Sequence, residues 1–359
     1  MPLKIYQIGY KNSFPYEMAI PSPAGAIAPA SGFILPAVIA DQGDKAAERF
    51  FTFFTDTIPN QNTRAAYYRN IMRFFARMQA KGLSLSAIKS YHVSAYLAEL
   101  TLTGKPQSAS TPTVKQHLAS LRMLFDWLIT GQVIDANPAA AVRAAKYVVK
   151  KGKTPVLKAD QARELLDSIP LRIGPEPKEG EPDNRPPSLI GLRDRALIAV
   201  MVFSFARIGA TLGMKVEDYY TEGRRAWFRL HEKGGKRHEV PAHHNAEDYL
   251  DAYIAAAGIE ADKKTPLFRS IDRHRCLTDR PMHRIDAWRM IKRRAKAVGL
   301  PEAICNHTFR ATGITAYLEN GGTIEHAQQI ANHESPKTTK LYDRTSDQIT
   351  LDEVERIVI

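Results

Sequence analysis

The sequence predicts a mainly α-helical protein of two domains, with a small antiparallel sheet in the second domain. Its 359 residues exceed what a single hydrophobic core usually serves. Apolar residues recur at helical spacing through most of both halves, and glycine or proline punctuates them. Residues 226–241 differ, because two extended arms flank Gly234 and Gly235, which form a two-residue turn of the hairpin kind.

The N-terminal segment, residues 1–43, is predicted to be an arm that is either poorly structured or docked on the rest of the protein. Residues 18–40 carry no charge, as a membrane span would, but prolines at high density break helices. The interrupting prolines are Pro21, Pro23, Pro29 and Pro36. We therefore predict no membrane association.

Residues 44–143 are predicted to form a compact helical domain. Apolar residues at helical spacing predict helices around 50–54, 67–78, 93–100 and 114–128. The expected N-caps are Asn62-Thr63 for the second helix and Thr113 for the fourth. Arg69, Arg73 and Arg77 lie four residues apart on the second helix and share one face. That face suits contacts with DNA phosphates, but it equally suits an ordinary solvated surface.

Residues 144–157 are predicted to be a basic, exposed linker, because lysines are interspersed there with Gly152 and Pro155. Its lysines are Lys146, Lys150, Lys151 and Lys153. On a protein that binds DNA such a linker would lie along the phosphate backbone, although a plain hinge explains the composition as well.

Residues 158–359 are predicted to form a second, mixed α/β domain with the hairpin at its centre. The expected helices span 160–168, 189–205, 285–298, 308–318, 323–331 and 351–358, and 170–188 is expected to be a surface loop. The last helix has an apolar stripe, which would either dock on a neighbouring subunit or pack on its own domain.

The overall charge points to a polyanionic partner. Fifty Lys and Arg against 38 Asp and Glu give a net charge of +12, which favours nucleic acid, although a merely soluble basic surface is the alternative. The two cysteines, Cys276 and Cys305, lie far apart, so neither a disulfide framework nor a cysteine-based zinc site is expected.

Several residues of the second half could carry chemistry together. His307 and Arg310 are three apart and share a helix face, Arg207 follows an apolar run, and Lys233 lies at the hairpin turn. Each has an ordinary structural explanation when taken alone, as a surface pair, a helix cap or a turn lysine. The segment ANHESPKTTKLYDR adds His333 and Tyr342.

A tyrosine hydroxyl has an ordinary pKa of about 10, so it needs a base and nearby cations to act as a nucleophile. Two arginines, a lysine and two histidines are what a tyrosine attacking a phosphodiester requires. No carboxylate cluster has metal-ligand character, so we expect no metal and no cofactor, with the positive charge supplied by side chains.

These residues, in this order, resemble the tyrosine recombinase (phage integrase) family, which includes the Xer- and Cre-like site-specific DNA recombinases. The likeness rests on FARIGATLGMKVEDY around Arg207, EKGGKRHEVP around Lys233, HTFR at 307–310 and the segment that ends at Tyr342. The intervals of twenty-six residues from Arg207 to Lys233 and nine from His333 to Tyr342 also suit the family.

The resemblance implies a helical core-binding domain at 44–143 and a catalytic domain at 158–359, which together form a C-shaped clamp on double-stranded DNA. It implies a homotetramer, no cofactor or ATP, and a cytoplasmic, nucleoid-associated protein. Tyr342 would form a 3′-phosphotyrosyl intermediate and Arg207 and Arg310 would clamp the phosphate. His307 would be the general base, Lys233 the general acid, and His333 would hydrogen-bond the phosphate or help proton transfer.

Two positions depart from the family pattern. Many relatives carry an acidic residue where this chain has Ala210, so support for Arg207 or for Lys233 would come from elsewhere, such as Glu217 or Asp218. Asn332 replaces the usual glycine before His333. The alternatives to a recombinase are a type IB topoisomerase-like enzyme and a non-catalytic DNA-binding regulator on the same fold.

Overall fold

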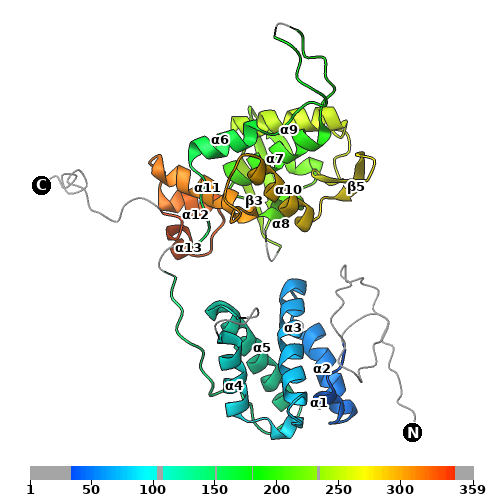
Figure 1. Ribbon diagram of the computed structural model, residues 1–359, viewed down its shortest axis with the longest axis vertical. Coiled ribbons are helices and arrows are strands. Elements are labelled where there is room, and N and C mark those ends of the chain that lie inside the picture. The colour runs from blue at the N-terminus through cyan, green and yellow to red at the C-terminus, as the bar shows by residue number, and fades with distance from the viewer. Residues whose placement is uncertain (1–33, 103–107, 150–151, 180, 233–234, 344–359) are drawn as a thin grey trace, which may run out of the picture. The chain divides into compact units, whose positions relative to one another are not determined.

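The computed structural model describes residues 34–102, 108–149, 152–179, 181–232 and 235–343 (Figure 1). The chain divides into two compact units, Met1–Val148 and Val149–Ile359. The division falls inside the predicted linker, 144–157. Each unit encloses its own apolar core, so the two units correspond to the two domains that the length of the chain predicts.

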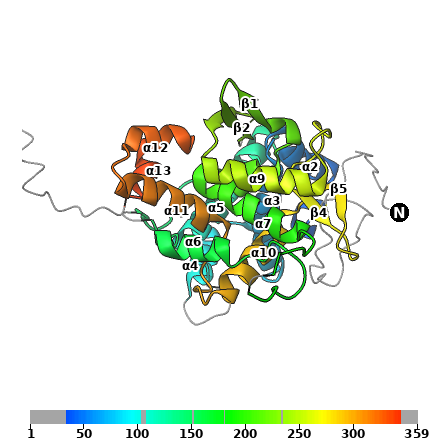
Figure 2. The ribbon, with the colours of Figure 1, turned by 90° about the horizontal axis from the view of Figure 1, so that it is seen from above.

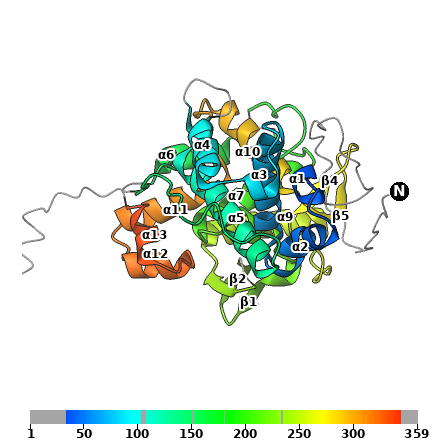
Figure 3. The ribbon, with the colours of Figure 1, turned by 90° about the horizontal axis from the view of Figure 1, so that it is seen from below.

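The first unit is a helical bundle. Its helices are α1 (Ala37–Ala40), α2 (Asp44–Asp56), α3 (Gln61–Gln79), α4 (Ser90–Thr101) and α5 (Thr111–Thr130), with a short 3₁₀ turn at Leu85–Ala87. The helix α5 packs against α2, α3 and α4, and Figure 3 shows α3 beside α5. Aromatic rings fill the centre of the core, where Phe74 meets Tyr96 edge-on at 5.1 Å between ring centroids.

The start of this unit packs on its core. Val38 and Ile39 of α1 are buried in the core, and the Tyr68 hydroxyl accepts a hydrogen bond from the Ile34 backbone N–H at 2.6 Å. Of the two predicted alternatives, residues 34–43 therefore fit the docking arm and not the poorly structured one, because Pro36 precedes a short apolar helix and does not interrupt it. Residues 1–33 lie outside the described part of the chain.

The helix caps of this unit differ from the prediction. Asn60, and not Asn62-Thr63, caps α3, since its side-chain oxygen accepts from the backbone N–H of Asn62 and of Thr63 at 3.1 Å each. The helix α5 begins at Thr111 and not at Thr113, because the following proline lies in the first turn, where its missing N–H costs nothing.

The second unit is built around one buried helix, α7 (Leu189–Phe203), which runs beside α9 (His244–Ala257) and also contacts α11 (Asn306–Glu319) (Figure 2). The other helices are α6 (Ala159–Asp167), α8 (Ile208–Leu212), α10 (Arg284–Ala297), α12 (Ile324–Ile330) and α13 (Pro336–Lys340). The strands are β1 (Tyr219–Glu222), β2 (Arg225–His231), β3 (Arg237–Pro241), β4 (Arg269–Ile271) and β5 (Leu277–Pro281). Several of these were not predicted, namely α8, α9, α13, β1, β4 and β5.

The predicted hairpin is part of a three-stranded antiparallel sheet in the order β1-β2-β3. Phe228 and Leu230 of β2 are fully buried, as their alternation in the sequence predicted. Phe228 pairs with Val240 of β3, and the backbone N–H of Glu232 donates to the Lys236 carbonyl at 2.8 Å. Lys233 and Gly234, at the tip, lie outside the described residues.

The predicted linker is only partly exposed. Val148 is exposed, but further along the backbone N–H of Gly152 donates to the Leu341 carbonyl at 3.1 Å. The N–H of Leu157, itself buried, donates to the Thr312 hydroxyl at 3.0 Å. Residues 152–157 therefore belong to the second unit, because the apolar end of the segment has a core to join. None of the helices in the described ranges combines the length and apolarity that a bilayer span requires.

Candidate active site

The helix α11 carries His307 and Arg310 on one face, as their spacing predicted. Arg310 is only 1% exposed, and its guanidinium donates to the backbone carbonyls of Phe205 and Ala331, the latter at 2.5 Å. Its Nε is buried without a hydrogen-bond partner among the described residues. Burial, and then the charge of Arg207, lowers the pKa of Arg310 to about 10, so it stays protonated at neutral pH.

The approach of α11 to α7 depends on Gly313. A β-carbon at this position would lie 2.0 Å from the Val202 carbonyl oxygen and 2.8 Å from the ring of Phe205. Phe205 itself has a left-handed backbone, with φ of 53°, which ends the α7 segment and turns its carbonyl to Arg310. The absence of a side chain at 313 thus lets Arg310 reach the end of α7.

Arg207 stands directly before α8, as its N-cap residue. Its guanidinium donates from NH1 to the carboxylate of Glu232 at 2.7 Å. Glu217 and Asp218, which the sequence suggested as its support, serve other groups. Glu217 pairs with Lys215 at 3.8 Å, and Asp218 binds the His231 ring at 3.1 Å.

Tyr342 follows α13 and is packed into a small apolar cluster of the second unit, with its side chain only 7% exposed. Its hydroxyl lies 2.7 Å from Nε2 of His307. The ring of His333 stacks on the tyrosine ring, with centroids 5.8 Å apart and planes 8° from parallel. The Tyr342 carbonyl accepts from the Thr315 hydroxyl of α11 at 2.9 Å, which fixes the backbone as well.

The charges around Tyr342 set the protonation of the site. Burial raises the pKa of Tyr342, while the neighbouring charges of Arg310 and Arg207 act in the opposite direction. Burial, and then the same two arginines, lowers the pKa of His307 below its ordinary value. At neutral pH the site therefore holds a neutral phenol, with a neutral imidazole placed to accept its proton.

His333 is held in place by two neighbours that the sequence analysis did not single out. Its Nδ1 lies 2.9 Å from the buried hydroxyl of Thr339, and its carbonyl accepts from the Gln328 side chain at 3.0 Å. Burial, followed by the charges of Arg310 and Arg207, lowers the pKa of His333 to about 3, so the ring is neutral. Asn332, just before it, has a left-handed backbone with φ of 46°, a conformation that glycine and asparagine adopt most readily.

The hairpin that carries Lys233 is attached to the tyrosine segment. His238 of β3 lies 3.0 Å from the Ile330 carbonyl at the end of α12. The Lys236 ammonium donates to Glu334, two residues beyond Asn332, at 2.8 Å. The position of Lys233 itself is outside the described residues, so its role stays a prediction.

The predicted DNA-contacting residues lie on α3 and in the segment 144–157, whereas the catalytic candidates lie in the second unit. Arg69, Arg73 and Arg77 are all exposed on α3, and Arg77 also pairs with Glu99 of α4 at 2.6 Å. Lys146 and Lys153 are exposed, and Lys150 and Lys151 lie outside the described residues. The helix α10 adds exposed residues that the sequence analysis did not single out, Arg284, Arg289, Arg293 and the half-exposed Trp288, and Arg289 pairs with Asp286 at 3.5 Å.

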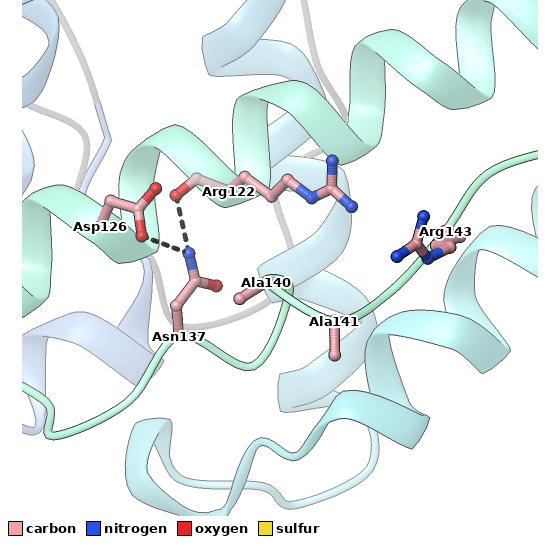
Figure 4. A pocket seen from close by; sticks show the side chains of 6 residues that line it. All are labelled: Arg122, Asp126, Asn137, Ala140, Ala141 and Arg143. Atoms are coloured by element: carbon pink, nitrogen blue, oxygen red, sulfur yellow. Dashed lines mark hydrogen bonds between the residues drawn. The ribbon is translucent and has the colours of Figure 1, made fainter.

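A pocket of about 390 Å³ in the first unit contains none of these residues (Figure 4). The Asn137 side chain on its wall donates to Asp126 at 2.7 Å and to the Arg122 carbonyl at 3.1 Å. Arg122 donates to the carbonyls of Ala139 and Val142. These polar groups fasten the segment after α5 to that helix. In the described ranges, no three acidic, histidine or cysteine side chains gather in a group that could hold a metal.

Comparison with known families and sequences gives a consistent result. Residues 157–348 match the model described as the phage integrase family, and residues 52–132 match its N-terminal SAM-like domain. The chain is 26% identical over 293 residues to tyrosine recombinase XerD of Mycobacterium leprae (strain TN), covering 78% of this chain and 86% of that protein. It is 27% identical over 291 residues to tyrosine recombinase XerC of Thermodesulfovibrio yellowstonii, covering 79% and 85%.

Two solved structures have a similar fold. The XerH site-specific recombinase, in a post-cleavage complex with a palindromic difH substrate, aligns with a TM-score of 0.60 and 20% identity over 82% of this chain and 79% of that one. A lambda integrase (75–356) dimer bound to a COC′ core site aligns with a TM-score of 0.58 and 20% identity, over 85% and 98%.

Proposed function

The chain belongs to the phage integrase family and is a site-specific DNA recombinase of the tyrosine type, and we propose that it cuts and rejoins DNA through a covalent 3′-phosphotyrosyl intermediate on Tyr342. The observation that carries this proposal is the 2.7 Å contact between the Tyr342 hydroxyl and Nε2 of His307, in a site that also holds Arg310. The related proteins are named as recombinases, so the topoisomerase alternative is not favoured.

The first step is attack by the tyrosine oxygen on the scissile phosphorus. The hydroxyl proton passes to Nε2 of His307 as the new oxygen–phosphorus bond forms, because the neutral imidazole is within hydrogen-bonding distance. A base of lowered pKa is a weak proton acceptor by itself. The positive charges of the arginines must therefore stabilise both the phosphate oxygens and the developing phenolate.

The arginines and His333 stabilise the charge on the phosphate. The buried Nε–H of Arg310, which lacks a partner among the described residues, is a donor that a phosphate oxygen would satisfy. Arg207 presents a partly exposed guanidinium from the end of the neighbouring segment. Where the Thr339 hydroxyl donates to Nδ1 of His333, the proton of that neutral ring sits on Nε2 and can be donated to the phosphate.

Strand cleavage is completed by departure of the 5′ oxygen. The phosphorus–oxygen bond to that sugar breaks, and Lys233 donates a proton to the leaving oxygen. The phosphotyrosyl ester keeps the bond energy, so a 5′-hydroxyl from another strand can attack it and release Tyr342 without ATP. Water is neither consumed nor formed, and the number of phosphodiester bonds is conserved.

The substrate we propose is a double-stranded recombination site. XerH and lambda integrase are bound to DNA substrates in their structures, and the net charge of +12 suits the same partner here. Exposed arginines on α3, Arg69 and Arg73, and on α10, Arg284, Arg289 and Arg293, are the candidate phosphate contacts. We further propose a homotetramer on DNA, with the C-terminal residues 351–358, outside the described part, docked on a neighbouring subunit.

The proposal is tested by trapping the intermediate. A binding site is first selected from random duplexes with the Tyr342→Phe variant, and is then rebuilt as a duplex with a nick beside the cleavage position, so that the cut fragment diffuses away. We expect the wild type to form a covalent protein–DNA adduct and Tyr342→Phe to bind without forming one, because it lacks the attacking oxygen.

The matched control is Tyr317→Phe, since Tyr317 lies beside the same apolar cluster and packs edge-on against Phe205 at 6.0 Å between centroids. This variant should form the adduct as the wild type does. An adduct with Tyr342→Phe, or loss of the adduct only in Tyr317→Phe, would show that the nucleophile is wrongly assigned. Joining of two marked duplexes distinguishes recombination from simple resealing.

A further inference from the structure

Arg207 lacks an acidic partner on its own helix. The helix α8 has no acidic residue in its first turn, and position 210, one turn beyond the arginine, is a buried alanine. The partner comes instead from the sheet, where Glu232 follows the last residue of β2 and accepts from NH1 of Arg207 at 2.7 Å. A guanidinium on a flexible side chain is otherwise free to point in many directions.

The two members of this pair are buried to different degrees. The Glu232 side chain is 4% exposed, whereas the Arg207 side chain is 41% exposed. The carboxylate therefore holds the arginine from the protein side, and the exposed part of the guanidinium still faces solvent. A carboxylate that merely occupied the place of a phosphate would itself lie on the open side and would be displaced by DNA.

The backbone of Glu232 is held in place by hydrogen bonds at the base of the hairpin. Its N–H donates to the Lys236 carbonyl at 2.8 Å, at the base of the hairpin, and the preceding residue, His231, is bound by Asp218 at 3.1 Å. The helix α8 also packs against β2. A short, buried carboxylate on a rigid strand end thus sets the direction of a long side chain on the adjacent helix.

We propose that Glu232 is a positioning residue of the recombination reaction, which holds Arg207 so that its exposed N–H groups face the scissile phosphate. The proposal rests on the proposed function of Arg207. Glu232 does not touch the phosphate; it supplies from the sheet the carboxylate that α8 lacks. Because it also directly precedes Lys233, the same ion pair fixes the base of the hairpin that carries the proposed general acid.

The test compares Glu232→Gln with Glu239→Gln. Gln keeps the size of the side chain and one acceptor oxygen but removes the charge that binds the guanidinium. Glu239 is a suitable control, because it lies on the same hairpin and pairs with an arginine, Arg229, at 2.9 Å, on a half-exposed part of the strand. Single-turnover adduct formation and DNA affinity are measured for both variants on the nicked duplex.

We expect Glu232→Gln to form the adduct on the order of 10- to 100-fold more slowly, with DNA affinity nearly unchanged, because a misplaced catalytic group costs rate more than binding. Glu239→Gln should react as the wild type does. Glu232→Asp keeps the charge and should recover part of the lost rate. It also serves as the test variant if Glu232→Gln does not fold.

A second substrate separates positioning from a general structural defect. In a duplex with a methyl group in place of one non-bridging oxygen, the scissile phosphate is neutral and has less need of Arg207. On one of the two diastereomers, the rate deficit of Glu232→Gln should shrink several-fold. An equal deficit on the charged and neutral phosphates, or a wild-type rate for Glu232→Gln, would overturn the proposal. Absence of any adduct with the wild type would instead contradict the proposed function itself.

Discussion

In the proposed mechanism, the Tyr342 hydroxyl loses its proton to the His307 ring, to which it is hydrogen-bonded. His307 can act as a base only while it is neutral. Burial, reinforced by Arg310 and Arg207, lowers its pKa below the ordinary 6.5, so the neutral form persists to lower pH than for a solvated histidine. This shift has a measurable consequence for the pH dependence of cleavage.

We expect the single-turnover rate of adduct formation to decline at acidic pH with a midpoint below 6.5, as His307 becomes protonated. The rate is measured on the nicked duplex across the pH range. His307→Gln, which has no basic nitrogen, should be slow and should lose this decline. A midpoint above 6.5 for the wild type would contradict the assignment of His307 as the base.

Asn332 gives a prediction about stability. Its left-handed backbone, with φ of 46°, costs a residue with a β-carbon about 1–2 kcal/mol unless a short polar side chain or glycine reduces that cost. We expect Asn332→Gly to leave the free energy of unfolding unchanged or slightly raised, and Asn332→Val to lower it by about 1–2 kcal/mol. Urea unfolding of the full chain measures both, and equal stability of the two variants would count against this reading of the departure from glycine.

At this scale the sequence predicted the residues better than their partners. Tyr342, His307, Arg310 and His333 were identified from short motifs, and the structure brings these four side chains together. The partner of Arg207 was not found, because Glu232 is 25 residues away and meets it only through the packing of β2 on α8. Pairings of this kind depend on tertiary structure, which spacing along the chain does not contain.

The packing of α11 on α7 decides where two of the candidate residues lie. Gly313 makes this packing possible, since a β-carbon there would lie 2.0 Å from the Val202 carbonyl oxygen. We expect Gly313→Ala to push α11 outward, to lower the free energy of unfolding by about 1–3 kcal/mol and to abolish adduct formation with the displacement of Arg310. Urea unfolding and the trapping assay measure the two effects.

Gly209 in α8 is the control for this substitution, because a β-carbon there would meet no atom within 4 Å. Gly209→Ala should raise the free energy of unfolding by about 0.5–1 kcal/mol, as alanine does at an open helical position. If both variants were equally stable, the approach of α11 to α7 would be looser than the structure indicates.

Element lengths explain most of the elements that the sequence failed to predict, although not the 14-residue helix α9. The long helices α3 and α5 carry several turns of apolar periodicity, and their predicted positions agree with the structure to within a few residues. The elements α8, α13, β1, β4 and β5 are five residues or shorter, so they carry too few positions to establish a period. The hairpin was found because its glycine pair marks the turn independently of periodicity.

For the whole molecule, the division into two units followed from chain length and from the basic stretch between two apolar regions. The boundaries were less predictable. Residues 34–43 and 152–157 read as arm and linker by composition, yet each contributes buried residues to the adjacent unit, Ile39 in the first and Leu157 in the second. Composition reports the average polarity of a segment. Whether the segment joins a core depends on the tertiary packing of a few of its apolar side chains, which composition does not report.

The contact of Tyr342 with His307 and its stacking on His333 lie within one polypeptide. In genetic terms, the proposed nucleophile and its proposed base are encoded in the same subunit, so a defect in either one inactivates that subunit. Two defective alleles, one encoding Tyr342→Phe and the other Arg207→Ala, should therefore fail to complement each other when expressed in the same cell. Each mixed assembly would contain only subunits that lack one essential group.

Recombination between two marked sites on a reporter plasmid measures this, with wild-type protein co-expressed with each variant as the control. Recovery of recombination by the two defective alleles together would mean that the active site combines the tyrosine of one subunit with the arginines of another. Failure to recover recombination would mean that each subunit cuts DNA with its own tyrosine and its own arginines. Mixing two defective proteins would then restore no activity.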